Sequence, residues 1–293
     1  MKPYIANCLL FITAIIWGSG FVVTDIALKY LSAYQVMAGR FLLAAILLII
    51  IFGHKLKKIT KSVIWKGTVL GVILYIAFAL QTVGLQYTTP SKNAFLTAVN
   101  VIIVPVITYA VYKRRIDGYE MIGAILAIIG IGCLSLQGAL TMNLGDVLSL
   151  LCAIGFAFDI FCTNLFVQKE DAIVLTIVQF ITAALISNLV VIFQGDISST
   201  FDNVAIYSVV YLAVFSTMMA YLFQNIANQY TSATKSAIIL STESFFGMVM
   251  SVLFLHEILT TRMVIGAVLI MTAILLAEVK PGYPKKQYID HTP

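Results

Sequence analysis

Long apolar runs alternate with short polar connections along almost the whole chain. Ten of these runs are long enough, at about 20 mainly apolar residues, to cross the hydrocarbon core of a bilayer as helices. They lie at residues 4–24, 32–52, 64–86, 93–112, 118–138, 146–166, 173–193, 205–227, 234–255 and 262–279. Because the connections are short, the pattern predicts an all-α integral membrane protein of ten transmembrane helices, followed by a solvated tail at 280–293.

Composition and charge agree with this prediction. The chain is 61% hydrophobic and 11% charged, far from the balance of a soluble domain. The net charge of +5 does not indicate a nucleic-acid partner, because Lys and Arg crowd the connections after the second and fourth windows. Positive residues accumulate in cytoplasmic loops, so both termini are expected in the cytoplasm. The partner of the chain's surface is then the lipid bilayer, and the expected location is the plasma membrane.

The sequence contains no pattern that indicates catalysis or metal binding. Its four cysteines lie inside apolar windows, without the spacing of a zinc site or a disulfide framework. No G-x-x-x-x-G-K-[ST], H-E-x-x-H or G-x-S-x-G motif occurs, and the three histidines lie at window ends or in loops. We therefore expect no enzyme activity, no cofactor and no metal.

An internal repeat divides the chain into two halves. The stretch "LQYTTPSKNAF" at 85–95 returns as "NQYTSATKSAI" at 228–238, at an offset of 143 residues that extends through windows three to five and eight to ten. The identical positions in the two stretches are Tyr87, Thr88, Lys92 and Ala94, which return as Tyr230, Thr231, Lys235 and Ala237. With five spans in each half, residues 1–140 and 141–279 are predicted to have opposite orientations. Inverted repeats are typical of transporters that use alternating access.

The second half resembles the EamA-type transporters of the drug/metabolite transporter superfamily. In that family a segment of the type Q-x-x-A-Q-x-x-T precedes a helix with L-E-P, then L-G-E, then I-G-A-x-L-I. The corresponding positions here are Gln224, Ala227, Asn228 and Thr231, then Thr242, Glu243 and Ser244, then His256 and Glu257, then Ile265, Gly266, Ala267, Leu269 and Ile270. Trp17 with Gly18 and Arg40 with Phe41 resemble further family positions in the first half.

The resemblance implies ten helices around a central cavity that carries small metabolites, amino acids or drugs, commonly outward. Two positions depart from the family pattern. Ser244 replaces the proline expected to break window 234–255, and His256 replaces a glycine. In the paired window 93–112, Pro105 predicts a kink.

Two acidic residues lie at membrane depth, where ionisable side chains usually face the interior of a bundle. Asp159 is followed by Cys162, Thr163 and Phe166 at helical spacing. For both Asp159 and Glu243, one interpretation is a cavity-lining group that binds a substrate amine or a proton. The other interpretation is a buried structural carboxyl, which Ser241, Thr242 or a neighbouring helix would hold in the case of Glu243.

The clearest polar face belongs to window 205–227. Tyr221, Gln224, Asn225 and Asn228 lie at i, i+3, i+4 and i+7 and must face protein or water. Gln81 is the repeat partner of Gln224, and Asn100 is that of Glu243. Gln81, Asn100, Gln224, Asn225 and Glu243 therefore either line one central cavity or form hydrogen bonds between helices.

Trp17 is either an aromatic wall of this cavity or a packing residue, and Gly18 and Gly20 are interpreted as packing residues. Arg40 is interpreted as structural, able to snorkel or to bond helix-end carbonyls. Glu257 and Arg262 are expected to pair or cap. Lys92 and Lys235 either close the two mouths of a pathway or anchor helix ends.

The leading hypothesis is a secondary transporter, an exporter of small organic solutes. Proton coupling through Asp159 or Glu243 stays open, as does a homodimer. The alternatives from other classes are a membrane receptor or scaffold and an intramembrane enzyme.

Overall fold

The structure is a computed structural model that describes residues 3–113, 118–135, 142–196 and 202–279. In these ranges the chain forms helices and no strand, which confirms the predicted all-α class. The elements up to residue 135 are α1 (Pro3–Ala27), α2 (Ala33–Phe52), the 3₁₀ helix η1 (Gly53–Lys58), α3 (Lys61–Leu85), α4 (Pro90–Thr97), α5 (Asn100–Tyr112) and α6 (Gly118–Ser135). The later elements are α7 (Leu144–Val167), α8 (Ala172–Gln194), α9 (Asn203–Tyr211), the π-helix η2 (Leu212–Met219), α10 (Ala220–Asn228), α11 (Ala233–Ser241), α12 (Glu243–Leu255) and α13 (Thr261–Val279).

Eight helical segments in the described ranges are long and apolar enough to cross a membrane. They agree with eight of the ten predicted windows, where α4 with α5, α9 with η2 and α10, and α11 with α12 each act as one segment. The remaining two windows correspond to α6 and α13, of which Thr261–Ala273 is a shorter apolar helix. The predicted tail at 280–293 lies outside the described residues.

Helix boundaries recur at the offset found in the sequence. Pro90 and Ala233 each begin a helix, as do Asn100 and Glu243, and Gly118 and Thr261, and each pair is 143 residues apart. The repeated stretch itself is a helix N-cap. The hydroxyl of Thr89 accepts a hydrogen bond from the Lys92 N–H, and Ser232 does the same for Lys235. The repeated stretches thus share a common local structure.

Two of the membrane-length segments are interrupted at equivalent positions. The N–H of Val99 donates to Leu96 O and that of Thr242 donates to Ile239 O, both at 3.3 Å, so each break is a tightened turn between consecutive helices. The first break lies before Pro105 and not at it, which corrects the predicted place of the kink.

The second break forms although Ser244 stands in place of proline. The hydroxyls of Ser241, Thr242 and Ser244 donate to the carbonyls of Ile238, Ile239 and Ser241. Such local side-chain bonds compete with regular helical hydrogen bonds and can replace a proline as the cause of a break.

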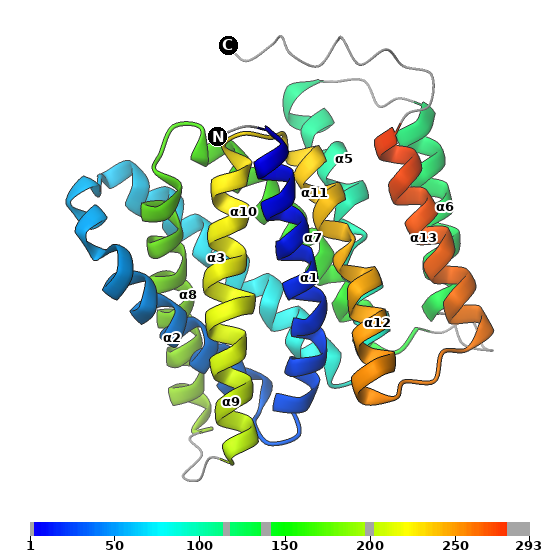
Figure 1. Cartoon of the computed structure of the whole chain (residues 1–293), viewed down its shortest axis with the longest axis horizontal. Coiled ribbons are helices and arrows are strands. Elements are labelled where there is room, and N and C mark those ends of the chain that lie inside the picture. The colour runs from blue at the N-terminus through cyan, green and yellow to red at the C-terminus, as the bar shows by residue number, and fades with distance from the viewer. Residues whose placement is uncertain (1–2, 114–117, 136–141, 197–201, 280–293) are drawn as a thin grey trace.

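The helices are arranged around α1, α7 and α10 (Figure 1). At one end of the molecule α6 packs mainly against α13, and at the other end α2 and α3 pack against α8. Helix α1 crosses α12 closely at Gly18, where an added Cβ would lie 2.8 Å from the Gly247 nitrogen. Helix α1 begins and α13 ends on the same face of the molecule.

Candidate functional site

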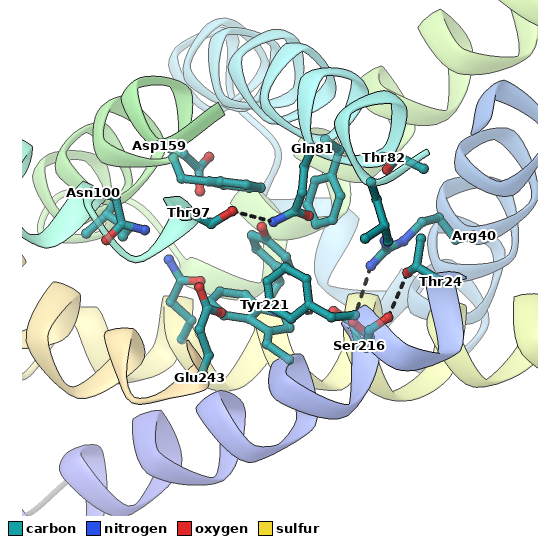
Figure 2. A pocket seen from close by; sticks show the side chains of 18 residues that line it. Thr24, Arg40, Gln81, Thr82, Thr97, Asn100, Asp159, Ser216, Tyr221 and Glu243 are labelled. Atoms are coloured by element: carbon teal, nitrogen blue, oxygen red, sulfur yellow. Dashed lines mark hydrogen bonds between the residues drawn. The ribbon is translucent and has the colours of Figure 1, made fainter. Parts of the chain in front are cut away.

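Helices from both halves of the chain surround a cavity with about 570 Å³ of space, part of which is open to the surroundings. Figure 2 shows its side chains, which come from α1, α2, α3, α4, α5, α7, η2, α10 and α12. The lining residues are Trp17, Gly20, Phe21, Thr24, Arg40, Phe78, Gln81, Thr82, Leu85, Thr97, Asn100, Phe156, Asp159, Ile160, Ser216, Tyr221, Gln224 and Glu243.

Most of the predicted cavity residues meet here. The seven that line the cavity are Trp17, Gln81, Asn100, Asp159, Tyr221, Gln224 and Glu243. Asn225 is the exception, since it is buried but is not among the lining residues. Its amide nitrogen instead donates to Thr176 Oγ1 at 2.8 Å and to Gln179 Oε1 at 3.3 Å, on α8.

Asp159 is held in position from behind by this polar layer. Gln179 Nε2 donates to Asp159 Oδ1 at 3.0 Å, and Gln179 Oε1 accepts from Asn225. All three side chains are buried. A chain of amides from α10 through α8 therefore orients the carboxyl that α7 presents to the cavity.

Glu243 and Asn100 occupy equivalent places, each as the first residue of the helix that follows a break. Glu243 has no hydrogen bond to another side chain of the described residues, because Ser241 and Thr242 donate to backbone carbonyls instead. The predicted alternative that these two hydroxyls hold Glu243 is therefore wrong. Asn100 Oδ1 is also buried without a partner in the described residues. Both side chains face the cavity (Figure 2).

The amide of Gln224 is the most fully unsatisfied group in the cavity wall. Neither its nitrogen nor its oxygen has a hydrogen-bond partner among the described residues, although the residue is fully buried. By contrast, Gln81 Nε2 donates to Thr97 Oγ1 at 3.2 Å. Buried polar atoms normally have partners, so the free amide of Gln224 is a group to which water or a solute can bind.

Arg40 also lines the cavity, with only 2% of its surface exposed. Its Nε donates to Thr217 Oγ1 at 2.9 Å and its Nη2 to Ser216 Oγ at 3.3 Å. The guanidinium lies 4.3 Å from the ring centroid of Phe78. This arrangement corrects the expectation that Arg40 snorkels or bonds helix-end carbonyls.

The π-helix η2 supplies the partners of Arg40 and Trp17. A π-turn widens the helix and changes where its side chains and carbonyls point. Here the Ser216 carbonyl accepts from Trp17 Nε1 at 2.9 Å, while the Ser216 and Thr217 hydroxyls accept from Arg40. No periodicity in the sequence indicated this segment, and Ser216 was missed for that reason.

Aromatic rings form the middle of the wall. Trp17 and Tyr221 lie with ring centroids 4.9 Å apart, and Phe78 contacts Phe156 at 5.2 Å and Tyr221 at 6.1 Å. Trp17 packs against both of the larger apolar clusters, so the cavity lies where these clusters meet. The sequence gave no sign that Phe78 and Phe156 would join this wall, because phenylalanine is common at every lipid-facing position.

The predicted helix-end residues lie away from the cavity lining. Lys92 Nζ is 3.9 Å from Asp146 Oδ2, whereas no ion pair of Lys235 occurs within the described residues. Glu257 Oε2 accepts from the N–H of Ser91 at 3.3 Å and from its hydroxyl at 2.7 Å, and also from the Ser251 hydroxyl. Glu257 thus caps α4, in agreement with its predicted role.

A second set of charged contacts joins the start of α3 to the α7–α8 connection. Lys66 Nζ lies 2.5 Å from Glu170 Oε1, and Lys55 Nζ lies 3.2 Å from Asp171 Oδ2. Hydrogen bonds from Lys66 and Ser62 lower the pKa of the Glu170 carboxyl. Among the described residues, no three His, Cys, Asp or Glu side chains are grouped so that they could hold a metal ion.

A bundle of apolar helices around a buried polar cavity defines a membrane protein able to hold a small solute. The sequence matches the EamA-like transporter family twice, over residues 4–136 and 143–278. The chain belongs to this family of membrane transporters.

Named relatives agree with this family. An uncharacterized transporter of Archaeoglobus fulgidus is 30% identical over 281 residues, covering 96% of this chain and 88% of the relative. The uncharacterized transporter YyaM of Bacillus subtilis is 26% identical, covering 93% of each chain. A solved crystal structure of a protein 13% identical in sequence shares the fold, with a TM-score of 0.70 over 94% of this chain and 96% of that one.

Proposed function

We propose that this chain is a secondary transporter that exports small organic solutes across the plasma membrane by alternating access through the cavity. The observation that carries the proposal is the unpartnered polar wall, in which Gln224, Asn100 and Glu243 face enclosed space. A purely structural set of buried amides would be expected to satisfy one another, as Gln179 and Asn225 do.

The proposed architecture has ten spans in two inverted five-helix repeats, residues 1–140 and 141–279, with both termini in the cytoplasm. Three observations support it. Helix starts recur 143 residues apart, the family matches each half separately, and α1 begins on the face where α13 ends. Opposed repeats around one cavity allow either side to open while the other is closed.

The test is solute flux in liposomes that contain the purified protein. The panel is a set of labelled amino acids, nucleobases and cationic dyes, and flux of at least one class is expected. Binding or chemical turnover without flux across the whole panel would favour the receptor or enzyme alternatives. Repeating the assay with and without a pH gradient determines whether a proton is coupled. Light scattering of the purified protein distinguishes a monomer from a homodimer.

A matched pair of variants tests the role of the cavity. Glu243→Gln is expected to lower flux at least about tenfold, the effect of about 1.4 kcal/mol of lost interaction. Glu257→Gln changes the same side chain at the cap of α4, so it is expected to lower the yield of folded protein more than the flux per folded molecule. Equal and mild losses of flux would assign Glu243 a structural role.

A further inference from the structure

Arg40 carries a positive charge into the cavity without an anion to balance it. Its side chain is buried, and no carboxylate of the described residues lies within ion-pair distance. The groups that accept hydrogen bonds from it, Thr217 and Ser216, are neutral hydroxyls. A guanidinium has five N–H donors, and these two hydrogen bonds use only two of them.

The surroundings fix the orientation of this charge. The ring of Phe78 covers one face of the guanidinium at 4.3 Å, and η2 binds Nε and Nη2. A planar guanidinium held in this way is suited to bidentate binding of a carboxylate. The hydroxyls of η2 position Arg40 but leave its charge unneutralised.

The two carboxyl groups of the cavity lie at its other end. In Figure 2 Arg40 is grouped with Thr24, Thr82 and Ser216, whereas Asp159, Asn100 and Glu243 lie on the opposite side, with Tyr221 between the groups. Asp159 is already oriented by Gln179. The cavity therefore has a basic end and an acidic end, separated by aromatic rings.

We propose that Arg40 binds the carboxylate of the transported solute and that the end formed by Asp159 and Glu243 binds its amine. The substrate class is then a zwitterion whose two charged groups are separated by an apolar body that contacts the aromatic wall. A phosphate dianion fits less well, because two carboxyl groups share the cavity with a single cation. This inference rests on the transport function proposed above.

The test compares amino acids with the amines that remain when their carboxylate is removed. Liposomes containing the full-length protein are loaded with lysine or cadaverine in one pair, and with phenylalanine or phenylethylamine in the other. Lysine is the preferred probe because its terminal amine is distant from its carboxylate. The wild type is expected to transport lysine at least about tenfold faster than cadaverine, which is the loss expected when a hydrogen-bonded charge pair loses one partner.

Variants assign this selectivity to Arg40. Arg40→Gln is expected to lower lysine flux to about the cadaverine rate while cadaverine flux stays unchanged. Arg40→Lys keeps the charge without the planar fork, so it is expected to retain selectivity at a higher half-saturating concentration and provides a second variant if Arg40→Gln does not fold. Arg262→Gln, at an exposed position at the start of α13, is the matched control and should transport both solutes as the wild type does.

Each outcome leads to a different conclusion. Equal transport of acid and amine by the wild type overturns the role of Arg40 and leaves the transport function intact. Selectivity that survives in folded Arg40→Gln also overturns it. Absence of flux for these probes and for the whole panel would mean that the proposed transport function itself has failed.

Discussion

The buried polar side chains of the cavity fall into two groups. Asp159 receives a hydrogen bond from Gln179, and Gln81 donates one to Thr97. Gln224 and Asn100 leave amide atoms without partners in the described part of the chain. Each unsatisfied atom costs about 1–3 kcal/mol unless water or a solute completes its hydrogen bonds. The second group is therefore the better candidate for direct contact with a solute.

Asp159 and Gln179 are predicted to have separable roles. Asp159→Asn keeps an oxygen that can accept the Gln179 hydrogen bond, so the free energy of unfolding should change by less than about 1 kcal/mol while flux falls at least about tenfold. Gln179→Leu removes the partner of both Asp159 and Asn225, so it should destabilise the fold by about 1–3 kcal/mol as well. Thermal unfolding in detergent and flux in liposomes measure the two effects.

The control for this pair is Asp25→Asn. Asp25 lies near the end of α1 and contacts only Lys29, at 3.6 Å, among the described residues. Such an exposed pair contributes about 0–1 kcal/mol, so neither stability nor flux should change much. A loss of stability in Asp159→Asn as large as that in Gln179→Leu would show that Asp159 is a structural residue.

At the residue scale the sequence identified the polar face of α10 but not how its residues divide. Tyr221, Gln224 and Asn225 span a wide arc of the helix, and only packing against α8 decides that Asn225 faces away from the cavity. Arg40 could not be placed either. Its position depends on a π-helix that no periodic pattern indicates and on hydroxyls from a distant part of the chain.

At the scale of elements, the ends of α5 and α12 share an unusual backbone. Lys113 and His256 follow these helices with φ angles of 58° and 54°, in the left-handed region that glycine favours. They lie 143 residues apart, and at the second position the family pattern has glycine. A side chain at such a position is accepted at some cost in strain.

His256→Gly is predicted to stabilise the protein. Glycine relieves the left-handed strain but adds freedom to the unfolded chain, so the net gain should be a few tenths to about 1 kcal/mol. His256→Ala is the control, because it removes the imidazole and keeps the strain. Thermal unfolding in detergent should therefore show a gain for glycine alone. An equal gain for alanine would mean that the imidazole, and not the backbone, is the source of the strain.

Helix positions were predictable because about 20 apolar residues are needed for each span, whereas the breaks within helices were not. Proline is a strong sequence signal, yet α4 ends before Pro105. The break at Thr242 depends on hydroxyls that bond to nearby carbonyls. Serine and threonine make such bonds in some helices and not in others, so their presence alone does not predict a break.

At the scale of the whole molecule, the repeated lysines lie at opposite faces. The α3–α4 connection, next to Lys92, is on the face opposite the α10–α11 connection, next to Lys235 (Figure 1). Their caps are alike, but only Lys92 has a nearby carboxylate, that of the fully buried Asp146. Thr88 also donates to Asp146 Oδ1 at 2.6 Å. A sequence duplication therefore produced two local structures of the same kind with different tertiary contacts.

This difference predicts unequal effects of the same substitution. Lys92 is mostly buried, with 16% of its side chain exposed, so Lys92→Gln leaves the Asp146 carboxylate without a counter-ion. It should destabilise the protein by about 1–3 kcal/mol. Lys235→Gln removes no ion pair known in the described residues and should change stability by less than about 0.5 kcal/mol. Thermal unfolding in detergent, with flux per folded molecule measured in parallel, compares the two.

A double-mutant cycle between Lys92→Gln and Asp146→Asn then distinguishes an ion pair from simple helix anchoring. If the two charges interact at 3.9 Å, the second substitution should cost less in the presence of the first, with a coupling of about 0.5–1 kcal/mol. A pair that closes one mouth of the pathway must also separate during transport. Its loss should therefore change flux per folded molecule, whereas loss of a helix anchor should change stability alone. Additive losses of stability with unchanged flux would assign Lys92 to anchoring, the same role as Lys235, and the repeated lysine would have no part in gating.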